Sequence, residues 1–180
     1  MVGKPNINAA EENIAYTIKI AREKFTYLVA GDKASLSKWF VTAKAASDEI
    51  RKILKDDKKD LSALDPEGKK TAIEMEKELV AATVKLQVSD VRKSFEKLKA
   101  GDIFVSPTYM ADHIREDLKA VDQNLSALDP EGKKSADEME KELTRITSEQ
   151  QLKISNWFVT SLREGDIVES VAYMEKRIRD

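Results

Sequence analysis

The sequence of residues 61–79 recurs almost unchanged at residues 125–143. Both copies begin with Leu-Ser-Ala-Leu-Asp-Pro-Glu-Gly-Lys-Lys and end with Glu-Met-Glu-Lys-Glu-Leu, and they differ at only two positions. The Gly-Asp-Ile sequence that begins at Gly101 recurs at Gly165, with the same spacing as between the two copies. A fixed spacing over this length indicates one supersecondary unit that is used more than once. The repeat therefore constrains the fold of the chain far more than its function.

Apolar residues are spaced as on helices along almost the whole chain. In the first segment, these positions are Ile14, Ile18, Ala21, Phe25 and Leu28. The same steps of three and four residues recur within residues 72–98 and 136–158. Such a narrow apolar stripe is typical of long helices in a bundle or coiled coil, and strand-type alternation is not found over any useful length. The sequence predicts an all-α protein.

The repeated segments also contain signals for where helices begin and end. Asp65-Pro66-Glu67, like Asp129-Pro130-Glu131, offers an N-cap carboxylate, a proline at the first helical position and a following acid. Gly101 and Gly165 suit left-handed C-terminal caps. We expect an antiparallel helical bundle or short array of about six helices, built from tandem helical-hairpin repeats. The expected helices are approximately 8–30, 34–57, 66–100, 106–122, 130–163 and 167–179, so that the two long helices extend beyond their partners.

A third, altered copy of the unit precedes the other two. Its clearest match pairs residues 25–32 with residues 95–102, and a later match follows with a changed spacing. We therefore expect residues 1–123 to form a four-helix bundle from the altered first hairpin and the first full copy. Residues 124–180 should then add the second copy of the hairpin to the same core.

Composition excludes several classes of function. The net charge of -2, with both signs interspersed, is unlike the basic surface of a nucleic-acid-binding protein. No apolar run is long enough to predict a membrane-spanning helix, and the N-terminus lacks the apolar core of a signal peptide. The absence of cysteine excludes disulfides, zinc-thiolate sites and thiol catalysis. The compartment stays open: cytoplasmic, or extracytoplasmic if the chain is an excised sensor domain.

Catalytic motifs are missing from the chain. His113 is the only histidine, and Met110 stands where a di-iron bundle would need a glutamate. The acidic residues 56–60 lack the alternating acids, central glycine and final glutamate of an EF-hand. We therefore expect no metal, no cofactor and no enzymatic activity. A metal-dependent helical-bundle enzyme is the least favoured alternative.

Aromatic residues supply the candidates for binding. Neighbouring residues on a helix point about 100° apart, so one member of each Trp–Phe pair should lie at the edge of the core or in an interface. Tryptophan is enriched at the energetic centres of protein interfaces. Two tyrosines also fall off the apolar stripe of the first predicted helix. The candidate ligand or partner contacts are Trp39, Phe40, Trp157, Phe158, Tyr16 and Tyr27.

One arrangement of motifs resembles a known family. The Leu-Asp-Pro-Glu-Gly sequences at 64–68 and 128–132 each precede a long charged helix, a Gly-Asp turn at 101–102 or 165–166, and a shorter final helix. This order is similar to that of the four-helix-bundle ligand-binding domains of methyl-accepting chemotaxis receptors. The resemblance implies a domain that binds small metabolites, often as a dimer, outside the cytoplasmic membrane. It assigns no ligand-contacting residue in this chain.

These observations leave two main hypotheses for function. The first is a non-enzymatic sensor or binding module that takes a small ligand between helices or across a homodimer seam. The alternative is a soluble helical-repeat scaffold that binds another protein through an exposed stripe or groove. Neither hypothesis involves nucleic acid or direct insertion of this chain into a membrane.

Overall fold

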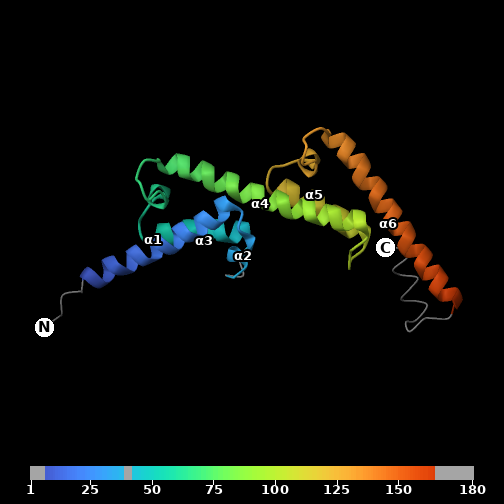
Figure 1. The fold of residues 1–180 in the computed structure, drawn as a ribbon, viewed down its shortest axis with the longest axis horizontal. Helices are drawn as coiled ribbons and strands as arrows, with labels where there is room; N and C mark the ends of the chain where they lie inside the picture. The colour runs from blue at the N-terminus through green and yellow to red at the C-terminus, as the bar shows by residue number, and fades with distance from the viewer. Residues whose placement is uncertain (1–6, 39–41, 165–180) are drawn as a thin grey trace. The chain divides into compact units, whose positions relative to one another are not determined.

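The computed structural model describes residues 7–38 and 42–164, and the regular structure in these parts is helical (Figure 1). The helices are α1 (Ile7–Ala30), α2 (Lys33–Ser37), α3 (Ala43–Asp56), α4 (Ala72–Ala100), α5 (Pro107–Ala120) and α6 (Ala136–Glu164), with 3-10 helices η1 (Leu61–Leu64) and η2 (Leu125–Leu128). Residues 7–38 and 42–164 contain no strand. The prediction of an all-α protein is confirmed.

The chain divides into two compact units, Met1–Gln87 (unit 1) and Val88–Asp180 (unit 2). Unit 1 contains α1, α2, α3, η1 and the first half of α4. Unit 2 contains the second half of α4, followed by α5, η2 and α6. The sequence predicted a boundary at 123–124, whereas the division lies inside α4. The reason is the length of that helix, whose two halves contribute to separate cores.

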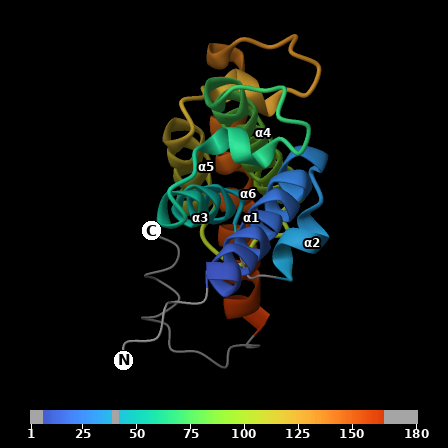
Figure 2. The same cartoon turned by 90° about the vertical axis from the view of Figure 1, so that its left-hand side faces the viewer.

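Unit 1 is held together by the apolar stripe predicted for its first helix. α1 and α3 pack side by side (Figure 2), and Phe25 and Leu28 of α1 are buried in one cluster with residues of α3 and α4. Arg22 ties η1 to this pair, because its Nε donates a hydrogen bond of 2.7 Å to the carbonyl oxygen of Ala63. Thr17 Oγ1 also donates to the Asp57 carboxylate at the end of α3.

Unit 2 repeats these contacts with the corresponding residues. Arg92 Nε donates to the carbonyl oxygen of Ala127 over 2.6 Å, as Arg22 does to Ala63 in unit 1. An ion pair recurs in the same way: Arg51 of α3 with Glu76 of α4 in unit 1, and Arg115 of α5 with Glu140 of α6 in unit 2, are each separated by 2.6 Å. The repeated sequence therefore forms the same local contacts in both places.

The two long helices begin later than the sequence predicted. α4 starts at Ala72 rather than Pro66, because the Asp65 carboxylate accepts hydrogen bonds from the backbone N–H groups of residues 67, 69 and 70. These bonds hold a turn in which Gly68 has a φ of +65°. A reciprocal cap at Thr71 and Glu74 then starts the helix, with the Glu74 carboxylate accepting from the Thr71 N–H over 2.7 Å.

The second copy corrects the prediction for residues 130–163 in the same way. Asp129 holds the equivalent turn, and Ser135 with Glu138 forms the reciprocal cap, so α6 starts at Ala136 rather than Pro130.

The predicted helix 34–57 is also interrupted. α2 ends at Ser37, residues 39–41 lie outside the described part of the chain, and α3 begins after its N-cap Thr42. Ser106 caps α5 in the same manner. Residues 33–41 therefore stand where unit 2 has only residues 103–105, which accounts for the changed spacing between the two sequence matches. The helix predicted at 167–179 lies outside the described residues.

Acid should weaken the fold through the repeated caps. Backbone N–H groups hold the pKa values of four carboxyls below their ordinary range: the N–H of Lys70 for Asp65, of Thr71 for Glu74, and their counterparts for Asp129 and Glu138. A depressed folded-state pKa stabilises the protein above the unfolded-state pKa of about 4, and this contribution is lost as pH falls through the folded-state pKa. We expect the urea midpoint to fall between pH 7 and pH 3.

The paired substitution Asp65→Asn with Asp129→Asn tests the origin of this effect. The double variant should lose less of its urea midpoint on acidification than the parent protein, because two of the titrating groups are gone. An equal loss in both proteins would show that other carboxylates carry the pH dependence.

Candidate functional site

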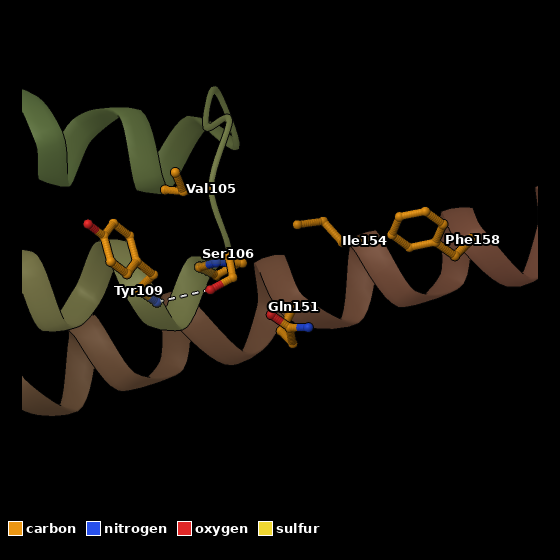
Figure 3. Close-up of a pocket in the computed structure, with 7 residues that line it drawn as sticks. Val105, Ser106, Tyr109, Gln151, Ile154 and Phe158 are labelled. Carbon is orange, nitrogen blue, oxygen red and sulfur yellow. Dashed lines mark hydrogen bonds between the residues drawn. The ribbon is translucent and has the colours of Figure 1, made fainter. Parts of the chain in front are cut away.

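A groove of about 380 Å³ lies in unit 2, between the start of α5 and the second half of α6 (Figure 3). Its lining residues are Val105, Ser106, Pro107, Tyr109, Gln151, Ile154 and Phe158. The view in Figure 3 shows Tyr109 and Val105 at one end, with Ile154 and Phe158 following along α6. Most of these side chains are aliphatic or aromatic, so the groove suits an apolar group with a few polar contacts.

Capping chemistry positions the α5 side of the groove. Ser106 Oγ accepts a hydrogen bond of 3.1 Å from the backbone N–H of Tyr109 (Figure 3), and Pro107 fills the first helical position, where its missing N–H is no loss. This cap fixes the direction in which the chain enters α5. Tyr109 therefore lies in the first turn of α5, where it lines the groove.

A hydrogen bond from Gln150 helps to position the α6 side. Gln150 is only 5% exposed, and its Nε2 donates a hydrogen bond of 2.9 Å to the carbonyl oxygen of Lys99 at the end of α4. α6 continues for several turns beyond this contact, and residues 151, 154 and 158 of that extension line the groove.

Tyr109 lines the groove, and two more exposed aromatic residues directly precede lining residues in the sequence: Phe104 precedes Val105, and Trp157 precedes Phe158. Phe104, Trp157 and Tyr109 are 97%, 63% and 55% exposed. The Trp157 ring packs edge-on against Phe158, with the ring centroids 5.0 Å apart. The Tyr109 hydroxyl is 2.9 Å from His113 Nε2, which holds the tyrosine ring against the histidine. Large exposed aromatic side chains in and next to the lining of a groove typically mark an interaction surface.

The groove also contains polar groups that can hold a ligand. The side-chain oxygen of Gln151 is buried and has no hydrogen-bond partner within the described residues. Most buried polar atoms in folded proteins are paired, so an unpaired acceptor can receive a donor from a bound molecule. Ser106 and Tyr109 line the same space.

The residues singled out from the sequence are distributed unevenly around this site. Phe158 lines the groove and is 5% exposed, while its neighbour Trp157 is exposed and is not part of the lining. Tyr16 is 62% exposed and Tyr27 packs partly buried against the core of unit 1, so neither belongs to the groove. Trp39 and Phe40 lie outside the described residues.

Sequence reasoning missed most of the lining, including Tyr109, Gln151 and Ile154. One signal was present: Phe104-Val105-Ser106 matches Phe40-Val41-Thr42, so two apolar residues directly precede both N-caps. The same apolar pair therefore precedes both helices, and Val105 of the second copy belongs to the lining of the groove. The sequence gives no sign of which part of α6 would lie opposite.

Other chemistry is not apparent in the described ranges. They contain no cluster of three or more histidine, cysteine, aspartate or glutamate side chains placed to hold a metal ion. None of the helices in residues 7–38 and 42–164 is both long and apolar enough to cross a membrane. Comparisons of the chain with protein-family models, curated proteins and solved structures found no match.

Proposed function

We propose that the chain is a non-enzymatic helical binding module that takes a protein partner at the groove of unit 2. The observation that carries the proposal is an apolar groove lined by the exposed Tyr109, with the exposed Phe104 and Trp157 each directly before a lining residue in the sequence. Leaving such side chains in water is unfavourable, and burying them in a partner supplies most of the free energy of association.

The extent of the apolar surface favours a protein over a small molecule. Phe104 and Trp157 are exposed and each directly precedes a lining residue, but neither lines the groove itself, so one small ligand in the groove would leave them in water. An apolar side chain of the partner would enter between Tyr109 and Phe158. The flanking aromatic residues would then pack against the neighbouring part of the same partner.

Substitution of Tyr109, which lines the groove, together with the exposed Trp157 tests this function. We expect the variant Trp157→Ala with Tyr109→Ala to capture the protein's partner about tenfold less tightly or worse, because aromatic residues at such sites dominate binding. The partner is first obtained by cross-linking to the unmodified chain, and its affinity is then measured with purified proteins. Ile73→Ala is the matched control, because Ile73 is an exposed apolar residue of unit 1. Equal affinity of the double variant and the control would exclude the groove as the binding surface.

A small ligand in the same groove is the second candidate, and it agrees with a sensor of the chemotaxis-receptor type. The observation that favours it is the unpaired side-chain oxygen of Gln151, which can accept a hydrogen bond from a ligand. A thermal-shift screen with amino acids, organic acids and purines tests it. A ligand that stabilises the parent protein but not Gln151→Leu would support this candidate, and a screen without any shift would remove it.

A further inference from the structure

Unit 1 contains one element that unit 2 lacks, the short helix α2. It lies in the connection between the end of α1 and Thr42, the N-cap of α3. In unit 2, residues 102–105 make the equivalent connection, between the end of α4 and Ser106, the N-cap of α5. Val105 of this shorter connection lines the groove. α2 is therefore an insertion in the connection that borders the groove in the other unit.

The surroundings of α2 show what fills the equivalent place in unit 1. Leu36 of α2 is 3% exposed and shares one core cluster with Ala43 of α3 and Leu86 of α4. By the repeat, Ala43 corresponds to Pro107, which lines the groove. Leu86 corresponds to Gln150, and the α6 side of the groove begins at the next residue. Unit 1 therefore buries the leucine of one helical turn where unit 2 has the groove.

A polar contact accompanies this leucine. Lys33 lies three residues before Leu36, so the two side chains are neighbours on the helical turn. Lys33 Nζ donates a hydrogen bond of 3.5 Å to the carbonyl oxygen of Leu86. In unit 2, the residue after the counterpart of Leu86 is Gln151, whose buried side-chain oxygen has no partner within the described residues. Both places thus have an oxygen acceptor beside the apolar space, and a donor from an occupant can satisfy it.

We propose, resting on the function proposed above, that the groove takes a single helical turn of the protein partner. A leucine of this turn enters between Tyr109 and Phe158, as Leu36 enters the core of unit 1. A lysine or arginine three residues earlier donates to the side-chain oxygen of Gln151, as Lys33 donates to an oxygen of α4. The lining contains no lysine or arginine, so the partner's basic group meets no like charge among the lining residues.

A graft between the units tests whether the groove accepts such a turn. Residues 33–41 replace residues 103–105 in the full chain, which gives unit 2 the connection of unit 1. The grafted leucine should fill the groove and weaken partner capture about tenfold or more, because a tethered occupant competes at a high effective concentration. The matched control is the same graft with Leu36→Asp in the grafted copy. It should capture the partner as the parent chain does and melt about 3 °C or more below the leucine graft. Equal melting temperatures of the two grafts, or undiminished capture by the leucine graft, overturn the proposal.

The role of the basic residue is tested within the same graft. Lys33→Met in the grafted copy should lower the melting temperature by about 2–4 °C, because the donor to Gln151 is lost. With Gln151→Leu already present, Lys33→Met should change the melting temperature little, since the acceptor is gone. An equal loss in both backgrounds overturns the pairing of this basic residue with Gln151.

Cross-linking identifies the segment of the partner that occupies the groove. Phe104→p-benzoylphenylalanine places a photoreactive group at an exposed residue directly before Val105 of the lining. After irradiation of the full chain with its partner, mass spectrometry of the joined peptides should find a lysine or arginine followed three residues later by a leucine. Joining to residues 165–180 of the chain itself, or to a partner segment without this pair, overturns the proposal.

The two proposals fail in distinguishable ways. If Trp157→Ala with Tyr109→Ala weakens capture but the leucine graft does not, the partner binds the groove through a different segment, and only the helical turn is excluded. If the leucine graft melts above its control but neither the graft nor the double variant weakens capture, the groove accepts the turn without being the partner's binding surface. The proposed function then fails, and the partner's helical turn fails with it.

Discussion

Leu143→Ala should lower the free energy of unfolding by about 2–5 kcal/mol. Leu143 is fully buried on α6, between Met139 and Ile146 in the apolar stripe that forms the core of unit 2. Alanine removes most of the side chain, and the surrounding helices close only partly around the space that is left. Urea unfolding followed by circular dichroism measures the loss, with Thr144→Ala as the exposed neighbour that should change stability little.

The counterpart Leu79→Ala makes this prediction specific to the repeated unit. Leu79 is also fully buried and occupies the same position in the repeated sequence, so its loss should agree with that of Leu143→Ala to about 1 kcal/mol. A common transition in both variants would show that the units unfold together, whereas two transitions would require a value for each unit. A loss below about 1 kcal/mol at either site would contradict the close packing on which the prediction rests.

Helix type could be predicted from the sequence, but helix starts could not. The apolar spacing along α1, α4 and α6 fixes a helix because no other structure places those residues on one side. Two capping signals compete before α4, however: Asp65-Pro66-Glu67 and, a few residues later, Thr71 with Glu74. Both satisfy the free N–H groups of a helix start. In the structure, the Asp65 carboxylate holds a turn instead of starting the helix. That turn requires a positive φ at Gly68, which the sequence alone does not reveal.

The groove was less predictable because its two sides are distant in the sequence. Phe158 could be selected as a large aromatic residue beside a tryptophan, and the structure places it in the lining. Tyr109 and Gln151 line one groove because α6 packs against α5, with Gln150 hydrogen-bonded to the end of α4. At this position the repeat itself changes, since unit 1 has Leu86 where unit 2 has Gln150. Comparing the two copies identifies this difference, but it does not reveal that Gln150 bonds to Lys99.

Because Gln150 stands where unit 1 has Leu86, Gly101→Ala should lower the free energy of unfolding more than Gly31→Ala does. Both glycines end a helix with positive φ, +78° and +70°, so alanine at either site should cost about 1–2 kcal/mol in backbone conformation. The surroundings differ. A Cβ at Gly31 would lie 3.9 Å from Leu86, an ordinary contact, whereas one at Gly101 would lie 2.9 Å from the side-chain oxygen of Gln150.

Gln150 has to move to accommodate that Cβ, and the movement breaks its hydrogen bond to Lys99 in a buried setting. The lost bond adds about 1–2 kcal/mol, so Gly101→Ala should cost about 2–4 kcal/mol in total, measured by urea unfolding. A double-mutant cycle isolates the contact: with Gln150→Ala already present, Gly101→Ala should cost no more than Gly31→Ala, because the obstructing side chain is gone. Equal costs for the two glycines in the parent chain would show that Gln150 moves freely and does not fix α6 beside the groove.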